Sequence, residues 1–585
     1  MKRRVVIASM FIEFILLTLI DEQAAFANTI YVRESATGTG ASWTDACGDL
    51  QNALDAAVSD DEIWVATGSY KPSVEVGGTG DRYRTFQLKN AVAIYGGFAG
   101  NEPNTFDLDD RNFETNETIL SGDIGIQGND ADNCYHVFYH PSGTILDTTA
   151  ILDGVTITAG NADGTYSPHQ SGAGMYNYNV IPTLSNCTFT DNSADYVGGG
   201  MRNYYRGPAV IGCSFSSNTA GNSGGGMYNL QCDPTVIDCA FTDNFAAHPG
   251  GAMYNPDRDP TVTGCTFNKN LAKMDGGGMC NENHSSPTLT NCIFSGNSAD
   301  YFGGGMLNDI SWPTVTGCTF AGNSATNSGG GMGNTFSSNS IVTNCTFTGN
   351  SAGNGGGLLN SGSNPTVSNC IFTANLADLG GGICNVFDSP TVSNCIIWDN
   401  NAPSGGDEIF NISSTPVISY CDIKGGYSGG TNIIDTDPMF VDPNGDDNIP
   451  GTKDDNLLFS ADSPCIDAGD NGYVPADIAD LDNDGNTVEQ IPFDLNGFPR
   501  FIDDICVADT GNGISPVVDM GAYEFLRSDI DSNGDVNFND FSKFTLYWLD
   551  IDCGVCGGAD LTCDRDVNGL DLNEFAVSWL EGTAP

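Results

Sequence analysis

Two stretches near the C-terminus place oxygen-bearing side chains at the spacing that a calcium ion requires. The first covers residues 529–540, with Gly534 at its sixth position, and the second covers residues 560–571. Calcium takes six to eight oxygen ligands, and alternate residues of a tight loop offer them from one side. The sequence therefore predicts two calcium loops, with ligand candidates Asp529, Asp531, Asn533, Asp535 and Asp540 in the first and Asp560, Thr562, Asp564, Asp566 and Asp571 in the second.

The second loop departs from the pattern of the first. Thr562 offers a hydroxyl where the first loop has a carboxylate, and Arg565 stands where the first loop has a glycine. We therefore expect the first loop to bind calcium more tightly than the second.

A third acidic loop contains half of the same pattern. Asp480, Asp482 and Asp484 alternate and are followed by Gly485, but the twelfth position is Ile491 and cannot complete the ligand set. Asp442, Asn444 and Asp446 form a weaker version. Each of these two loops is either a calcium site or a solvated acidic turn.

A short helix is expected after each of the two C-terminal loops. The apolar side chains share a spacing of i, i+3, i+4, i+7 and i+8, which is typical of one helix face. The first set is Phe541, Phe544, Thr545, Trp548 and Leu549, and the second is Leu572, Phe575, Ala576, Trp579 and Leu580. A duplicated calcium loop and helix, with Asp540 and Asp571 at the twelfth positions, resembles a type I dockerin domain. This resemblance implies a cohesin-like domain or another surface scaffold as partner; the alternative is an acidic helical hairpin without metal.

Upstream of these loops, one sequence motif recurs every 25 to 27 residues. Ten cysteines mark the period: Cys187, Cys213, Cys239, Cys265, Cys292, Cys318, Cys345, Cys370, Cys395 and Cys421. Nine of them are followed five residues later by Asn, and a second frame places an apolar residue two positions before another Asn, from Met175/Asn177 to Ile409/Asn411. The alternation within each copy is that of a strand, and glycines mark the turns. We predict an all-β fold, a right-handed parallel β-helix with turns of about 26 residues, followed by the small α-helical calcium-loop domain.

The phrases Gly-Gly-Gly-Met-x-Asn and Phe-x-x-Asn resemble the GGA(I/L) and FxxN repeats of the polymorphic outer-membrane protein family, which are bacterial surface β-helices. The start of the chain resembles the N-terminal region of secreted pectate-lyase-like β-helix proteins. Two further motifs, at residues 463–470 and 519–524, resemble the ends of the "choice-of-anchor" segment that follows such β-helices.

These patterns divide the chain into five parts. Residues 1–27 read as a signal peptide, because Lys2, Arg3 and Arg4 precede an apolar run and a small-residue cleavage site. Residues 28–160 form an N-terminal cap and irregular first turns, residues 161–432 the regular repeats, residues 433–525 an aspartate-rich segment and residues 526–585 the dockerin-like domain.

The charge balance restricts the partners. With 20 Lys and Arg against 74 Asp and Glu, the net charge is -54, so nucleic acid and anionic membranes are poor partners. We expect an extracellular or cell-surface protein in which no segment after the signal peptide spans a membrane.

The repeated cysteines are expected to be buried thiols, because each occupies a small inward position. Cys553, Cys556 and Cys563 lie outside the repeat and are expected to include a disulfide. Cys280 and Cys384 occupy an outward position that other copies fill with Tyr.

That outward position carries a set of residues that could contact a sugar chain: Tyr176, Arg202, Tyr228 and Tyr254. Strand neighbours face opposite sides, so these side chains are expected to stack one turn apart on the outside. The alternative is that the rings only stack on each other and stiffen the sheet.

Catalysis would need convergent charged residues that interrupt the repeat. The one candidate interruption is Arg202, Arg206, Asp257, Arg258 and Asp259, with Lys269 and Lys273 nearby. Two functions follow: a non-catalytic β-helix for adhesion or glycan contact, or a polysaccharide lyase or glycoside hydrolase. Either would use calcium as its cofactor and a polysaccharide as its ligand, and the sequence names no catalytic residue.

Overall fold

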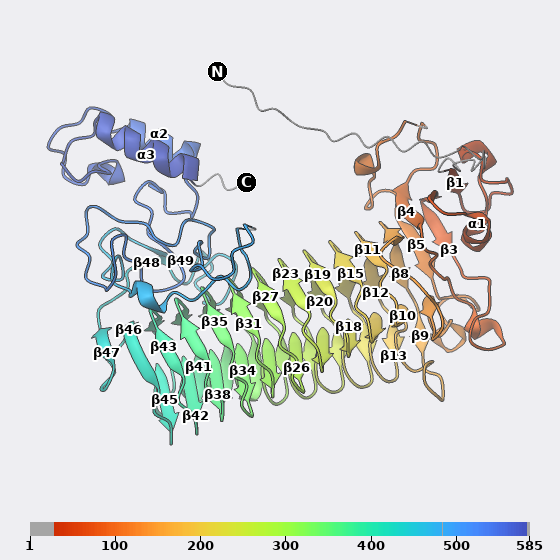
Figure 1. The fold of residues 1–585 in the computed structure, drawn as a ribbon, viewed down its shortest axis with the longest axis horizontal. Helices are drawn as coiled ribbons and strands as arrows, with labels where there is room; N and C mark the ends of the chain where they lie inside the picture. The colour runs from red at the N-terminus through yellow and green to blue at the C-terminus, as the bar shows by residue number, and fades with distance from the viewer. Residues whose placement is uncertain (1–27, 104, 483, 582–585) are drawn as a thin grey trace, which may run out of the picture.

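The computed structural model describes residues 28–103, 105–482 and 484–581. The predicted signal peptide and Asn483 of the third acidic loop lie outside these residues. The described chain is an elongated coil of strands, with irregular structure at its N-terminal end and long loops and two helices at the other (Figure 1).

One turn of the coil contains four short strands. A representative turn consists of β18 (Met227–Leu230), β19 (Thr235–Ile237), β20 (Ala240–Thr242) and β21 (Phe245–Ala246). Each strand directs its alternate residues inward, because strand neighbours face opposite sides. Asp238 and Asp243 have positive φ of 51° and 53° at the corners between strands, a conformation that Asp and Asn tolerate better than most residues.

Successive turns pair in parallel and in register. Met227 pairs with Met253 and Phe241 with Phe267, so like residues lie above one another. The Met-x-Asn strands form an 11-stranded sheet from β6 (Phe138–His140) to β45 (Ile409–Ile412), and the strands after the Phe form a 9-stranded sheet from β9 (Asn161–Ala162) to β41 (Leu376–Leu379). The two strands beside each Cys belong to a 27-stranded sheet. The predicted parallel β-helix is therefore confirmed.

The interior is filled by columns of identical side chains. Eight Phe rings, from Phe189 to Phe372, stack with centroids 4.5–5.0 Å apart. All ten repeated cysteines are buried and free, as predicted. Packing of this kind leaves little room for substitution, because protein interiors are as dense as organic crystals.

Two ladders of buried asparagines run along the coil. One continues from Asn192 to Asn400, and the other from Asn177 to Asn411. Each amide donates to the next turn, so each ladder needs an extra partner at its ends. His140 Nδ1 lies 2.8 Å from Asn177 Oδ1, Asn411 donates to the Tyr427 hydroxyl, and Asn400 donates to Glu408. Burial raises the pKa of Glu408 to about 8.

The N-terminal end is closed by a helix. The strands there include β1 (Thr29–Val32), β2 (Asp61–Ala66) and β4 (Val92–Phe98). Between β1 and β2, within the predicted N-terminal cap, the chain forms a 3-10 turn (Trp43–Asp45) and then α1 (Leu50–Ala56). Leu50 and Leu54 of α1 join the same core as Val32 and Ile63. This helix therefore packs against β1 and β2 and extends the core at the N-terminal end of the coil.

The C-terminal part folds back over the coil. After β46 (Val417–Ile423) and β47 (Thr431–Ile434), the antiparallel pair β48 (Phe440–Asp442) and β49 (Asn456–Phe459) begins a loop-rich region. Leu457, Phe459 and Met520 pack on Ile371 and Ile396, which face outward from the 27-stranded sheet. The chain then ends in α2 (Phe538–Thr545) and α3 (Gly569–Glu581). The predicted first helix is shorter than expected, since Trp548 and Leu549 lie beyond it. None of the helices among the described residues has the length and apolar character to cross a membrane.

Candidate functional site

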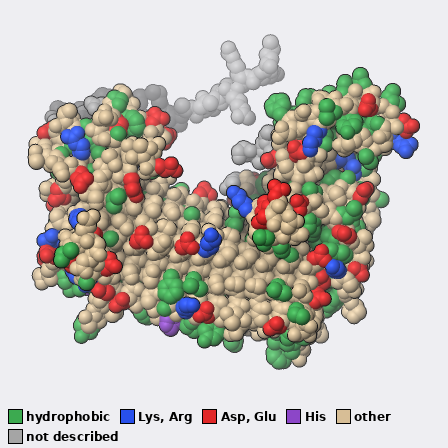
Figure 2. Space-filling view, turned by 180° about the vertical axis from the view of Figure 1, so that it is seen from behind, with side chains coloured by type: hydrophobic (Ala, Val, Ile, Leu, Met, Phe, Trp, Pro, Cys, Tyr) green, Lys and Arg blue, Asp and Glu red, His purple; other side chains and the backbone are tan. Residues whose placement is uncertain are grey.

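The folded-back segment creates a groove on the outward face of the coil. Its floor is formed by β24 (Thr266–Asn268), β28 (Ile293–Ser295), β32 (Thr319–Ala321) and β36 (Thr346–Thr348). Its wall consists of residues 451–453, Asp455, Leu457 and Tyr523, and its volume is about 520 Å³. Figure 2 shows that the molecule is hollowed between raised regions at its two ends.

The floor of the groove is lined by small hydroxyl side chains. Strand alternation sends Phe294 and Phe320 into the core and leaves Ser295 and Thr319 on the outside. Thr266, Thr319 and Thr346 share one column, which Ile293 interrupts, and Ser295 and Thr348 share the next, which Ala321 interrupts. Thr346 and Thr348 are buried, so the accessible hydroxyls of the floor are those of Thr266, Ser295 and Thr319. Ile293, Leu457 and Tyr523 add apolar surface. Such a surface offers both hydrogen bonds and apolar contact to an extended ligand.

Two charged residues lie in the groove. Lys453 is exposed at the wall. Asp455 is half-buried and accepts hydrogen bonds from Gly451 N (2.6 Å) and Thr348 Oγ1 (3.5 Å). Burial raises the pKa of the Asp455 carboxyl. Lys453 is therefore the side chain in the groove that could pair with an anionic ligand.

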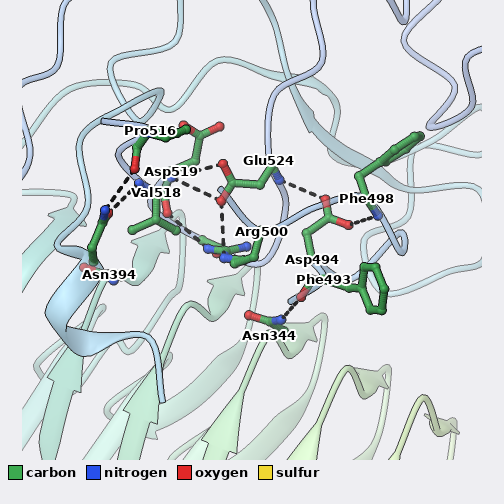
Figure 3. A network of polar contacts seen from close by, with 12 residues as sticks. Asn344, Asn394, Phe493, Asp494, Phe498, Arg500, Pro516, Val518, Asp519 and Glu524 are labelled. Atoms are coloured by element: carbon green, nitrogen blue, oxygen red, sulfur yellow. Dashed lines mark hydrogen bonds and ion pairs between the residues drawn. The ribbon is translucent and has the colours of Figure 1, made fainter. Parts of the chain in front are cut away.

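A buried polar network braces the turn that carries Tyr523 of the groove wall (Figure 3). Arg500 is fully buried, its Nε lies 3.2 Å from Glu524, and its Nη2 donates to the carbonyls of Asp519 and Gly521. Asp494 accepts the backbone N–H of Glu524. Burial raises the pKa of Asp494 to about 6 and that of Asp519 to about 7. Tyr523 lies within this braced turn, so the motif at residues 519–524 positions part of the groove.

The expected row of outward aromatic residues is only partly accessible. Tyr176, Arg202, Tyr228 and Tyr254 do occupy successive turns. Tyr176 is only 5% exposed, however, and Cys280 and Cys384 are fully buried. The expectation of an open outward row is therefore wrong at these positions.

Glycine turns explain this burial. Gly276 has a φ of 62°, and a Cβ on it would lie 2.6 Å from Cys280 Cβ. Gly250 lies equally close to Tyr254, with a corresponding distance of 2.7 Å. The turn before each strand thus folds back over the outward residue, and a side chain on the glycine would collide with it.

The neighbours of these side chains also occupy their faces. The Arg202 guanidinium lies 5.0 Å from the Tyr176 ring centroid, and Tyr228 and Tyr254 are 5.4 Å apart. The Tyr254 hydroxyl donates to Glu282 at 2.6 Å. These contacts favour mutual stacking in the row, while glycan binding by it stays a prediction.

The charged residues that interrupt the repeat are divided among three sheets. Arg202 lies on β14 (Met201–Tyr204), and Asp257 follows β22 (Met253–Pro256), both in the 11-stranded sheet. Lys269 follows β24 of the 27-stranded sheet, and Lys273 follows β25 (Leu271–Ala272) of the 9-stranded sheet. Arg206, Arg258 and Asp259 also follow β14 and β22, so the division separates the two lysines from the other five residues. The salt bridges found among the described residues join no two members of this set, and a catalytic role for it stays a prediction.

The two C-terminal loops share one hydrogen-bonding scheme. Asp529 accepts the N–H groups of Asn533 and Gly534, and Asp560 accepts those of Asp564 and Arg565. The twelfth residue of each loop accepts the N–H groups of its third and ninth residues, which are Asp531 and Asn537 for Asp540 and Thr562 and Asn568 for Asp571. The duplication read from the sequence therefore extends to the folded loops.

The donor sets of the loops differ. Carboxylate oxygens of Asp529, Asp531 and Asp540 lie within 4.8 Å of one another. Thr562 uses its hydroxyl to donate to Asp571 in the second loop. The remaining predicted ligands also lie in these loops, Asn533 and Asp535 in the first and Asp564 and Asp566 in the second. The first loop fits a hard cation such as calcium, and calcium binding by either loop stays a prediction.

The two acidic loops of residues 433–525 differ in how closely their predicted ligands lie to one another. Asp480, Asp482 and Asp484 converge within 4.8 Å, and Gly485 donates its N–H to Asp480. Asp442, Asn444 and Asp446 are exposed, and Asp454 caps their loop by accepting the N–H of Asp447. The Asp480 loop has the more compact donor set.

Two disulfides stabilise the C-terminal region. Cys553 pairs with Cys556, which confirms a disulfide among the three cysteines named from the sequence. Cys563 pairs with Cys506 of the preceding segment. Sequence reasoning missed this bond because the two residues are 57 positions apart.

The family model described as "Right handed beta helix region" matches residues 142–311 and 303–444. The chain therefore belongs to the right-handed β-helix family, which confirms the predicted hand of the coil. A comparison with curated protein sequences gives no match.

Several solved structures are similar in fold. The pectate lyase Pel9A is 14% identical, and the alignment covers 85% of this chain and 96% of that chain with a TM-score of 0.34. A rhamnogalacturonan lyase is 11% identical, with 70% and 84% covered and a TM-score of 0.22. A tailspike double mutant of E. coli bacteriophage HK620 is 14% identical, with 66% and 74% covered and a TM-score of 0.26.

Proposed function

We propose that this protein is an exported, non-catalytic β-helix that binds an extended polysaccharide in the groove beneath residues 451–457. The observation that carries the proposal is the groove itself, which combines the hydroxyls of Thr266, Ser295 and Thr319 with apolar side chains and has a volume of about 520 Å³. Binding sites of 300–1,000 Å³ with apolar walls and a few polar groups are typical of small-molecule ligands. A few sugar units of a longer chain would fit this space.

The chemistry of the groove favours a sugar over a nucleic acid or an anionic membrane as the ligand. Sugars present hydroxyls on their edges and apolar C–H groups on their faces, and the floor and the Tyr523 side offer matching contacts. Lys453 would pair with a carboxylate of an acidic sugar. The net charge of -54 disfavours nucleic acid and anionic membranes as ligands.

The C-terminal loops support a tether as the second half of the proposal. In this proposal Asp529, Asp531 and Asp540 bind calcium, and the dockerin-like unit docks on a cohesin-like domain or another surface scaffold. The β-helix, whose repeats resemble those of polymorphic outer-membrane proteins, would then present its groove at the cell surface. The residues after β47 resemble a choice-of-anchor segment and would connect the two functions.

The test compares two tryptophan variants of the mature chain on a panel of immobilised neutral and acidic polysaccharides. Ser295→Trp fills the groove, and we expect it to reduce retention at least tenfold. Ser216→Trp is the matched control: Ser216 occupies the same column outside the groove, and each serine hydroxyl donates to a neighbour one turn away. Unchanged retention of Ser295→Trp would contradict the proposed binding site.

The same panel tests the absence of catalysis. Reducing ends and unsaturated uronides are measured after long incubation with the wild-type protein and with Lys453→Gln. We expect neither product from either protein. Release of unsaturated uronides that depends on Lys453 would replace the binding proposal with a lyase.

A further inference from the structure

Asp467 is a buried carboxylate whose oxygens have no hydrogen-bond partner. Its side chain is 0% exposed, and neither Oδ1 nor Oδ2 has a partner among the described residues. Its backbone is well bonded, since its N–H donates to Asp519 and its carbonyl accepts from Thr510 and Gly511. The unsatisfied atoms are therefore confined to the carboxylate.

In the part of the chain that the structure describes, the two arginines of this segment are already paired with other carboxylates. Arg527 donates two hydrogen bonds to Asp504, and Arg500 pairs with Glu524. Burying an unpaired carboxylate costs several kcal/mol, so proteins pair such groups or bind metal with them. Burial, and then the charges of Asp519, Asp504, Asp503 and Asp509, raises the pKa of Asp467 to about 8. The carboxylates around Asp467 therefore destabilise its ionised form further and cannot compensate for its burial.

Two exposed carboxylates converge on this buried one. One oxygen from each of Asp467, Asp503 and Asp509 lies within 4.8 Å of the other two. We propose that Asp467, Asp503 and Asp509 form a divalent-cation site, separate from the C-terminal loops. A cation placed there would give Asp467 the partner that it lacks.

The ligand chemistry favours calcium. All three ligands are hard carboxylate oxygens, and calcium accepts an irregular set of six to eight oxygens at 2.3–2.6 Å. Asp503 and Asp509 are exposed, so water can complete the shell from the open side. Magnesium demands a near-ideal octahedron and loses its own water reluctantly, so we expect it to bind more weakly.

The position of the site gives it a structural role. Asp503 and Asp509 flank Cys506, which is bonded to Cys563 of the second C-terminal loop. Asp467 precedes Gly469, whose neighbour Asp470 exchanges two hydrogen bonds with Asn394 of the coil. A bound ion would therefore join the segment that carries the helical unit to the segment that rests on the β-helix.

The experiment counts calcium ions bound to the full mature chain. Protein is stripped with EDTA, dialysed against Ca²⁺, and analysed by atomic emission. The double variant Asp503→Asn with Asp509→Asn changes two exposed residues and should fold normally; we expect it to bind one calcium fewer than wild type. Asp462→Asn, an exposed aspartate on the preceding loop, is the control and should bind the wild-type number.

A second variant distinguishes a metal ligand from a buried neutral acid. Asp467→Asn should also lose one calcium, and its melting temperature without calcium should exceed that of wild type, because the unpaired carboxylate is gone. The loss should add to that of Asp540→Ala, which removes a ligand of the first C-terminal loop. Wild-type calcium content in both the double variant and Asp467→Asn would overturn the proposal.

Discussion

Asn297 offers a direct test of how much one rung of the asparagine ladder stabilises the coil. Its side chain accepts from the N–H and the amide of Asn270 at 3.0 and 2.9 Å. It donates to Phe267 O at 2.8 Å and to Asn323 Oδ1 at 2.9 Å. Asn297→Ala would remove these four hydrogen bonds at once in a fully buried position.

The expected loss follows from the partners that are left behind. An unsatisfied buried donor or acceptor costs about 1–3 kcal/mol, and the Asn270 N–H and the Phe267 carbonyl are fixed by the backbone and cannot turn away. Small rearrangements of Asn270 and Asn323 would recover part of the rest. We therefore expect a destabilisation of about 4–6 kcal/mol, which lies in the upper tail of single-residue effects.

The assay is chemical and thermal unfolding of the mature protein, followed by circular dichroism and Phe and Tyr fluorescence. Asn327→Ala is the control, because Asn327 is exposed and we expect its replacement to change stability by less than about 0.5 kcal/mol. Equal unfolding midpoints of the two variants would show that the hydrogen bonds of the Asn297 side chain do not stabilise the fold.

Three further predictions concern charge, thiols and calcium. Glu408→Gln should make the stability of the protein less dependent on pH. Between pH 4.5 and about 8, Glu408 of the wild type is ionised in the unfolded chain but still protonated in the folded chain, so the stability of the wild type falls as pH rises. The melting temperature of the variant should therefore rise relative to that of the wild type over this range. A variant that melts in parallel with wild type from pH 5 to 8 would contradict this. Cys239, Cys265, Cys292 and Cys318 should resist a thiol reagent until the protein is denatured, because all four are buried, and mass spectrometry of labelled peptides would show fast modification if they were accessible. Asp540→Asn should raise the calcium concentration for half-saturation at least tenfold, and more than Asp571→Asn does, in a titration monitored by terbium luminescence; equal effects would mean that the two loops bind alike.

Much of the fold was determined by local periodicity. The spacing of Cys187 to Cys421 predicted the turn length, and the Phe and Asn positions predicted which side chains face inward. These predictions succeeded because in-register stacking repeats the same contacts in every turn. The orientation of each side chain in one repeat therefore applies to all the other repeats. The C-terminal loops were equally local, since residues 529–540 carry all the donors of one loop.

The groove was decided only by the tertiary structure. Thr319 and Lys453 are far apart in the chain, and no spacing rule connects the regular floor with the irregular wall. Their meeting depends on apolar residues such as Leu457 and Met520 finding Ile371 and Ile396 on the outside of the coil. Isoleucine in this column does not by itself reveal the cover, because Ile293 occupies the same column and lies exposed on the groove floor.

The exposure of single side chains and the Asp467 cluster also depended on contacts between distant segments, which the sequence does not reveal. Alternation in a strand determines the side of the sheet on which Tyr176 or Cys280 lies, but burial depends on what else covers that side, and here the preceding glycine turn does so. Asp467, Asp503 and Asp509 have no shared spacing because they come from two loops that meet after folding. Local patterns determine the direction of a side chain from its own backbone; only the packing of distant segments decides which atoms surround it.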